Sequence, residues 1–169
     1  MDTLVKYNFS SKEEISSRNS VPILAWDFHY ESVNELKAVN EDLKKLDEFS
    51  SKFRWNTEKF NIKQRISQEV VIITDVEQTI VFASNGILNM TGYSKEEVVG
   101  QKPKMFQGSS TSPTVRKEIR KAIELSVPFD KTVINHKKNG STYKCKINCF
   151  PIFNIKGQLS HYIAFERAA

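Results

Sequence analysis

The stretch that decides the fold of this chain reads Thr91-Gly92-Tyr93-Ser94-Lys95-Glu96-Glu97-Val98-Val99-Gly100 and continues as Gln101-Lys102-Pro103-Lys104-Met105-Phe106-Gln107-Gly108. Within it, Ser94 and Glu97 have the spacing of a capping box, which predicts a short helix after a bend at residues 91–93. Some thirty positions later, Asn139-Gly140 is a strong hairpin signal, because both residues tolerate the positive φ of a type I′ turn. Together these signals predict a domain that mixes helices with antiparallel strands.

Hydrophobic patterning on either side of this stretch predicts strands and one longer helix. A β-branched run at 70–75 and a second at 79–83 are typical of strands. Ser112-Pro113 supplies an N-cap and a first-turn proline for a helix over about 114–126. Three more strands are expected at about 130–136, 141–153 and 159–167. This order predicts an α+β fold, in which a five-stranded antiparallel sheet carries helices on one face.

The first 66 residues differ from the rest, so we expect an N-terminal extension over 1–66 and one domain over 67–169. Ser32 and Glu35 have capping-box spacing, and an amphipathic helix is predicted over about 32–66. Its apolar residues recur at spacings of three and four, at Leu36, Val39, Leu43, Leu46 and Phe53. Two interpretations stay open: the helix lies on the sheet of its own domain, or it pairs with its copy in a second subunit.

Composition and charge exclude several classes of protein. Lys and Arg number 25 against 20 Asp and Glu, but the charges are interleaved, which argues against a nucleic-acid-binding surface. No apolar stretch is long enough to span a membrane, and the N-terminus lacks the pattern of a signal peptide. We therefore expect a cytoplasmic protein with no nucleic-acid or membrane partner.

The chain offers little for catalysis or metal binding. Cys145 and Cys149 are four positions apart in a predicted strand, which separates them by about 13 Å and excludes a disulfide between them. The three histidines are scattered, and no cluster has the spacing of a zinc site. The chain is therefore predicted not to be an enzyme.

Several motifs together resemble the PAS domain family, over about residues 65–169. They are Gly-Tyr-Ser-x-Glu-Glu-Val-x-Gly at 92–100, Gln107-Gly108, the helix at 115–123 and the Lys138-Asn139-Gly140 hairpin. The resemblance implies a sensory and interaction module that binds a small molecule between sheet and helices. It also implies a homodimer that passes its signal to an effector. Because the last predicted strand ends near residue 167, we expect output through a separate signalling protein, unless the chain is a fragment.

Within that family the chain is most similar to the flavin-binding LOV branch, but it departs from it at chemical positions. Where LOV photosensors carry their photoreactive cysteine, this sequence has Pro103. The resemblance implies further flavin-equivalent positions: Lys104 and Arg120 at the phosphate, Asn135 and Cys145 at the polar ring edge, Gln107, which is kept, and Glu166 in place of a glutamine.

These departures argue against the photochemistry of that branch. Without a thiol at residue 103, no cysteine adduct with flavin forms there. Cys145 offers weaker hydrogen bonds than an asparagine, and an ionised Glu166 donates none unless burial raises its pKa. We therefore expect a PAS sensory module with an unknown ligand or none. The alternative is a flavin (FMN) redox or light sensor without adduct chemistry.

Period-two alternation predicts which side chains face the interior and which face outward. The inward set implied by the resemblance comprises Val133, Asn135, Tyr143, Cys145, Ile147, Ala164 and Glu166. A simply filled core and a pocket for a small organic ligand both remain open. The outward set, Ile134, Phe150, Ile163 and Phe165, is too apolar to stay wet, so residues 21–66 or a second subunit should cover it.

Overall fold

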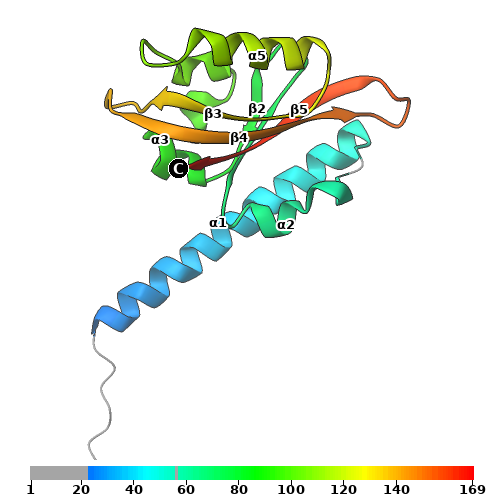
Figure 1. The fold of residues 1–169 in the computed structure, drawn as a ribbon. Helices are drawn as coiled ribbons and strands as arrows, with labels where there is room; N and C mark the ends of the chain where they lie inside the picture. The colour runs from blue at the N-terminus through cyan, green and yellow to red at the C-terminus, as the bar shows by residue number, and fades with distance from the viewer. Residues whose placement is uncertain (1–22, 56) are drawn as a thin grey trace, which may run out of the picture.

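A five-stranded antiparallel sheet forms the centre of the protein (Figure 1). The computed structural model describes residues 23–55 and 57–169, and for residues 23–29 and 58 it describes the backbone alone. The strands follow the order β2-β1-β5-β4-β3. Their bounds are Val70–Thr74 (β1), Ile80–Ala83 (β2), Phe129–His136 (β3), Thr142–Phe153 (β4) and Leu159–Ala168 (β5). The predicted α+β fold is confirmed, and the three C-terminal strands lie within a residue or so of their expected positions.

Short helices and one longer helix connect β2 to β3. They are α3 (Gly86–Thr91), α4 (Lys95–Val98), the 3-10 helix η2 (Pro103–Phe106) and α5 (Pro113–Glu124). The capping box is present, since the backbone N–H of Ser94 donates to Oε2 of Glu97 at 2.9 Å. Side chains from these helices pack against the inner face of the sheet in one apolar cluster with Ile72 and Val133.

The β3–β4 hairpin differs from the predicted turn. Gly140 has φ 83, but Asn139 is not among the described residues with positive φ, so the expected type I′ turn is wrong. Lys137 N–H instead donates to the Ser141 carbonyl at 2.7 Å, which closes a three-residue loop. The Asn139 side chain accepts the N–H of Ser141 at 3.0 Å and so stabilises the turn without left-handed backbone at residue 139.

The N-terminal helix begins and ends earlier than the prediction of about 32–66. Helix α1 runs unbroken from Ile23 to Phe53, so Ser32 lies inside the helix rather than at its N-terminus. The helix ends where Arg54 takes a left-handed φ of 54. A 3-10 turn, η1 (Glu58–Phe60), and the short helix α2 (Ile62–Arg65) follow. No glycine or proline interrupts residues 23–53, so nothing local starts the helix at Ser32.

Helix α1 covers the outer face of its own sheet, which confirms the first of the two interpretations. Its C-terminal half and the segment after it contribute Leu46, Trp55, Phe60 and Ile66 to an apolar cluster with outer-face residues that include Ile163 and Phe165. The N-terminal half projects beyond the sheet (Figure 1). There Tyr30, Val33 and Leu36 are 70%, 47% and 64% exposed.

A buried carboxylate fixes α1 to the inner-face helices. Asp42 is 1% exposed and accepts the backbone N–H of Asn85 at 2.6 Å and the ammonium of Lys95 at 2.5 Å. The Asn85 amide in turn donates to the Ala38 carbonyl at 3.0 Å. Residues 38–42 are therefore where the projecting half of α1 meets the domain.

Candidate ligand cavity

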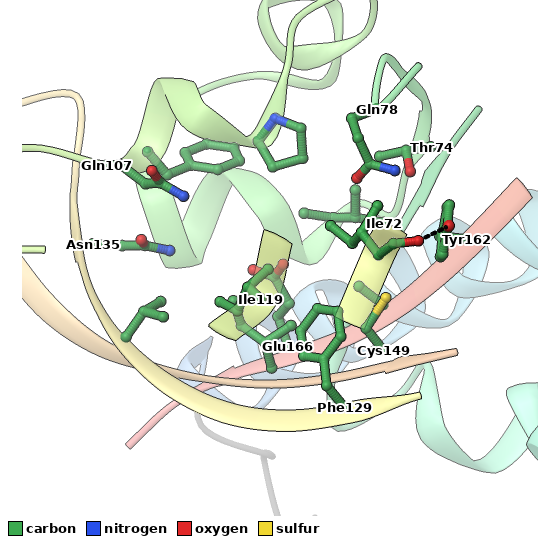
Figure 2. A pocket seen from close by; sticks show the side chains of 16 residues that line it. Ile72, Thr74, Gln78, Gln107, Ile119, Phe129, Asn135, Cys149, Tyr162 and Glu166 are labelled. Carbon is green, nitrogen blue, oxygen red and sulfur yellow. Dashed lines mark hydrogen bonds between the residues drawn. The ribbon is translucent and has the colours of Figure 1, made fainter. Parts of the chain in front are cut away.

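A cavity of about 80 Å³ lies between the inner face of the sheet and the roof formed by η2 and α5 (Figure 2). Its walls are mostly apolar. Ile72 of β1 and Phe129 of β3 line it from the sheet, and Ile119 and Ile123 line it from α5. The hydroxyl of Tyr162 on β5 donates to the Ile123 carbonyl at 2.8 Å, so the sheet and the roof are joined directly beside the cavity.

Three of the predicted site residues meet at this cavity. Asn135 of β3, Gln107 after η2 and Glu166 of β5 all line it, and Figure 2 shows Gln107 and Asn135 on the same side. Asn135 and Glu166 are buried. Of the other residues expected to face inward, Val133, Ile147 and Ala164 also line the cavity. Tyr143 and Cys145 do not line it but pack in the neighbouring inner-face cluster.

Cys145 is linked to the cavity through Glu166. Its thiol donates to Oε2 of Glu166 at 3.4 Å. Burial raises the pKa of Glu166 to about 7, although the hydrogen bond from Cys145 opposes the rise. Burial, followed by the neighbouring Glu166 charge, raises the pKa of Cys145 well above its usual range, so this thiol stays protonated. Near neutral pH the Glu166 carboxyl can therefore donate as well as accept a hydrogen bond.

Sequence reasoning missed a second polar end of the cavity. Thr74, the last residue of β1, and Gln78, in the turn after it, both line the cavity. Figure 2 shows them on the side away from Asn135 and Gln107. Among the described residues, Thr74 Oγ1 and Gln78 Nε2 are buried without a hydrogen-bond partner. Nothing in the local sequence marks them, because a polar residue at a strand end usually faces water.

The cavity adjoins an outer groove of about 620 Å³, and Gln78, Pro103 and Gln107 line both spaces. The structure places Lys104 and Arg120 in this groove rather than in the cavity. Lys102, Arg116 and Lys117 lie there too, against a single acidic residue, Glu124. The mouth of the cavity is therefore positively charged and suits an anionic group.

Few of the side chains that line the cavity are nucleophiles or metal ligands. Pro103 forms part of the wall. The one thiol lining the described cavity belongs to Cys149, on the sheet, and burial raises its pKa to about 12. A search of the described residues finds no group of side chains able to hold a metal ion. Nor is any described helix both long and apolar enough to cross a membrane.

Comparison with known proteins places this architecture among sensory domains. A family model described as "PAS domain" matches residues 68–167. A blue-light-activated histidine kinase of Brucella canis is 34% identical over 90 residues, which are 53% of this chain and 18% of that protein. Protein TWIN LOV 1 of Arabidopsis thaliana is 39% identical over 88 residues, 52% of this chain and 22% of that protein. The match thus spans about a fifth of the length of these curated relatives.

Solved structures give the same result. A light-oxygen-voltage domain studied with a flavin analogue superposes with a TM-score of 0.62 at 25% identity, covering 67% of this chain and 87% of the other. The light-state structure of the blue-light photoreceptor Aureochrome1 LOV has a TM-score of 0.59 at 27% identity, covering 64% and 88%. The resemblance first drawn from the motifs is therefore confirmed in three dimensions.

Proposed function

Because the chain belongs to the PAS domain family, we propose that it is a sensory and interaction module that works without cysteine-adduct photochemistry. The observation that carries this proposal is the cavity itself, which measures about 80 Å³ and has Pro103 in its wall. A carbon–sulfur adduct needs a thiolate beside the ring, and a proline ring supplies no nucleophile. The module would sense a small molecule, or the protonation state of Glu166, rather than capture light through a thiol.

The size of the cavity limits the ligand. An engineered protein cavity of about 150 Å³ is large enough for benzene, and this cavity has roughly half that volume. A three-ring isoalloxazine therefore does not fit unless α5 or the lining side chains move. A molecule of one ring, held partly in the cavity and partly in its mouth, fits the space better.

A flavin sensor without adduct chemistry is the second candidate, and two observations favour it. Asn135 and Gln107 present amide groups to the same side of the cavity, and the basic groove with Lys104 and Arg120 suits a phosphate. Cys145 counts against a flavin sensor, because this residue lies outside the cavity and its thiol donates a hydrogen bond to Glu166.

Signal output in this proposal runs through α1 to a signalling partner, with two copies of the chain paired. The outer sheet face, which we also expected at the dimer contact, is covered by α1 and α2 of the same chain, which leaves the projecting half of α1 as the surface for a second copy. The projecting half of α1 supports pairing, because Tyr30, Val33 and Leu36 expose apolar surface at a spacing of three. Two such helices would bury these residues against each other.

The test is the purified protein of residues 1–169, examined by absorption spectroscopy and by mass spectrometry after denaturation. We expect no flavin and no light-induced bleaching. In Pro103→Cys, a thiol without flavin should give no absorption change under blue light, as in the wild type. Stoichiometric flavin in the wild type would reject the first candidate in favour of the second, and Pro103→Cys would then be expected to form an adduct.

A further inference from the structure

Two buried polar atoms without partners gather at one end of the cavity. Thr74 is 5% exposed, and neither its Oγ1 nor the Nε2 of Gln78 has a hydrogen-bond partner. The described residues contain two other such atoms, on His136 and Tyr143, and neither residue lines the cavity. A buried donor left without an acceptor is costly, so two at one place indicate a group that the protein alone does not supply.

A strained backbone conformation holds Gln78 in position. Asp75 closes the turn after β1, since its carboxylate accepts the N–H of Thr79 at 2.7 Å and its own N–H donates to the Thr79 carbonyl at 2.9 Å. Within this turn Gln78 has φ 66, in the left-handed region that favours glycine. Backbone strain of this kind concentrates at functional sites, where the surrounding structure maintains it. In this turn, the strained backbone places the Gln78 side-chain amide at the junction of the cavity and the groove.

We propose that Thr74 and Gln78 form a hydrogen-bonding site for a neutral, ring-sized ligand that presents an acceptor atom, such as a ring nitrogen or a carbonyl oxygen. This inference rests on the proposed function and adds its ligand class. Gln78 Nε2 donates to the acceptor, and the Thr74 hydroxyl is placed to donate beside it. The rest of the ring lies against Ile119, which lines both the cavity and the groove, because the cavity alone is too small for the whole ring.

The experiment compares two rings of the same size, pyridine and benzene, at mildly alkaline pH, where pyridine is neutral. Binding to the full-length chain is followed by amide chemical shifts. We expect pyridine to bind about tenfold more tightly than benzene, because only pyridine accepts a hydrogen bond. Gln78→Met and Thr74→Val keep the shape of the wall but remove the donors, so both should reduce this preference. Gln158→Met, at an exposed position in the β4–β5 turn, is the matched control and should keep it.

Thermal unfolding separates a ligand site from a structural role. If the Thr74 hydroxyl lacks a partner, Thr74→Val should melt at the same temperature as the wild type or higher, whereas a structural hydrogen bond would make it melt lower. Equal affinities of the wild type for both rings, or a preference that survives both substitutions, would overturn this site and leave the proposed sensory cavity standing. Failure of both rings to bind the wild type would overturn the site together with the small-ligand cavity.

Discussion

Cys145 donates its thiol hydrogen to the Glu166 carboxylate across 3.4 Å inside the sheet, and the two residues lie on neighbouring strands. A thiol is a weak donor, so this contact only partly offsets the desolvation of Glu166. Because desolvation outweighs this hydrogen bond, the pKa of Glu166 is raised to about 7.

The stability of the protein should fall as pH rises through that range. The folded-state pKa of Glu166, about 7, exceeds its ordinary value of 4.5, so its contribution to stability is complete below pH 4.5 and is lost as pH rises through 7. The full difference is on the order of 3 kcal/mol. Glu166→Gln removes the titration, so its melting temperature relative to the wild type should increase between pH 5 and 8. A constant difference over that range would contradict the prediction.

Titration of His161 should have the opposite effect on the pH dependence of stability. It is buried with its ring 4.4 Å from Phe53 and 4.7 Å from Trp55, and burial lowers its pKa below 6.5. A lowered pKa gives stability that is present above pH 6.5 and lost as pH falls below it. We expect Trp55 to become more accessible to a fluorescence quencher in acid, and His161→Gln to lessen this change. If the acid response of His161→Gln equals that of the wild type, another group is responsible.

Loss of the Asp42 carboxylate should lower the free energy of unfolding, because this group joins α1 to the rest of the domain. Asp42→Ala leaves the Lys95 ammonium and the Asn85 N–H without their acceptor in a largely buried place, a change that typically costs about 3 kcal/mol. Urea unfolding measures the loss. Glu41→Ala, one position away and exposed, is the control and should change stability by less than about 0.5 kcal/mol. Equal effects of the two substitutions would show that the buried contact contributes nothing.

Pairing of two chains should depend on the projecting half of α1. Leu36→Glu places a charge in the proposed contact, so light scattering after size-exclusion chromatography should give the mass of one chain where the wild type gives two. Val76→Glu, at a similarly exposed apolar position after β1, should stay paired. A wild-type protein that is monomeric at all concentrations tested would end the dimer proposal.

The sequence predicted the sheet and the inner helices well because their signals are local. Ser94 with Glu97, Ser112 with Pro113, and the β-branched run at 70–74 each fix their own element. The predicted start of α1 was wrong because the capping pattern at Ser32 lies inside an uninterrupted helix, where it does not define a helix end.

The cavity was only half predictable. Asn135, Gln107 and Glu166 were found through resemblance, but Cys145 was expected at the cavity and packs beside it. Thr74 and Gln78 were missed because the burial of single atoms is set by the packing of η2 and α5 above them. No sequence motif records that packing.

The anchoring of α1 near Asp42 makes the projecting half a lever. Ile23 and Asp42 are nineteen positions apart in the helix, a rise of about 28 Å at 1.5 Å per residue. A bend of about ten degrees in α1 near Asp42 would therefore carry the tip through about 5 Å, while the half of α1 beyond Asp42 stayed packed on the sheet.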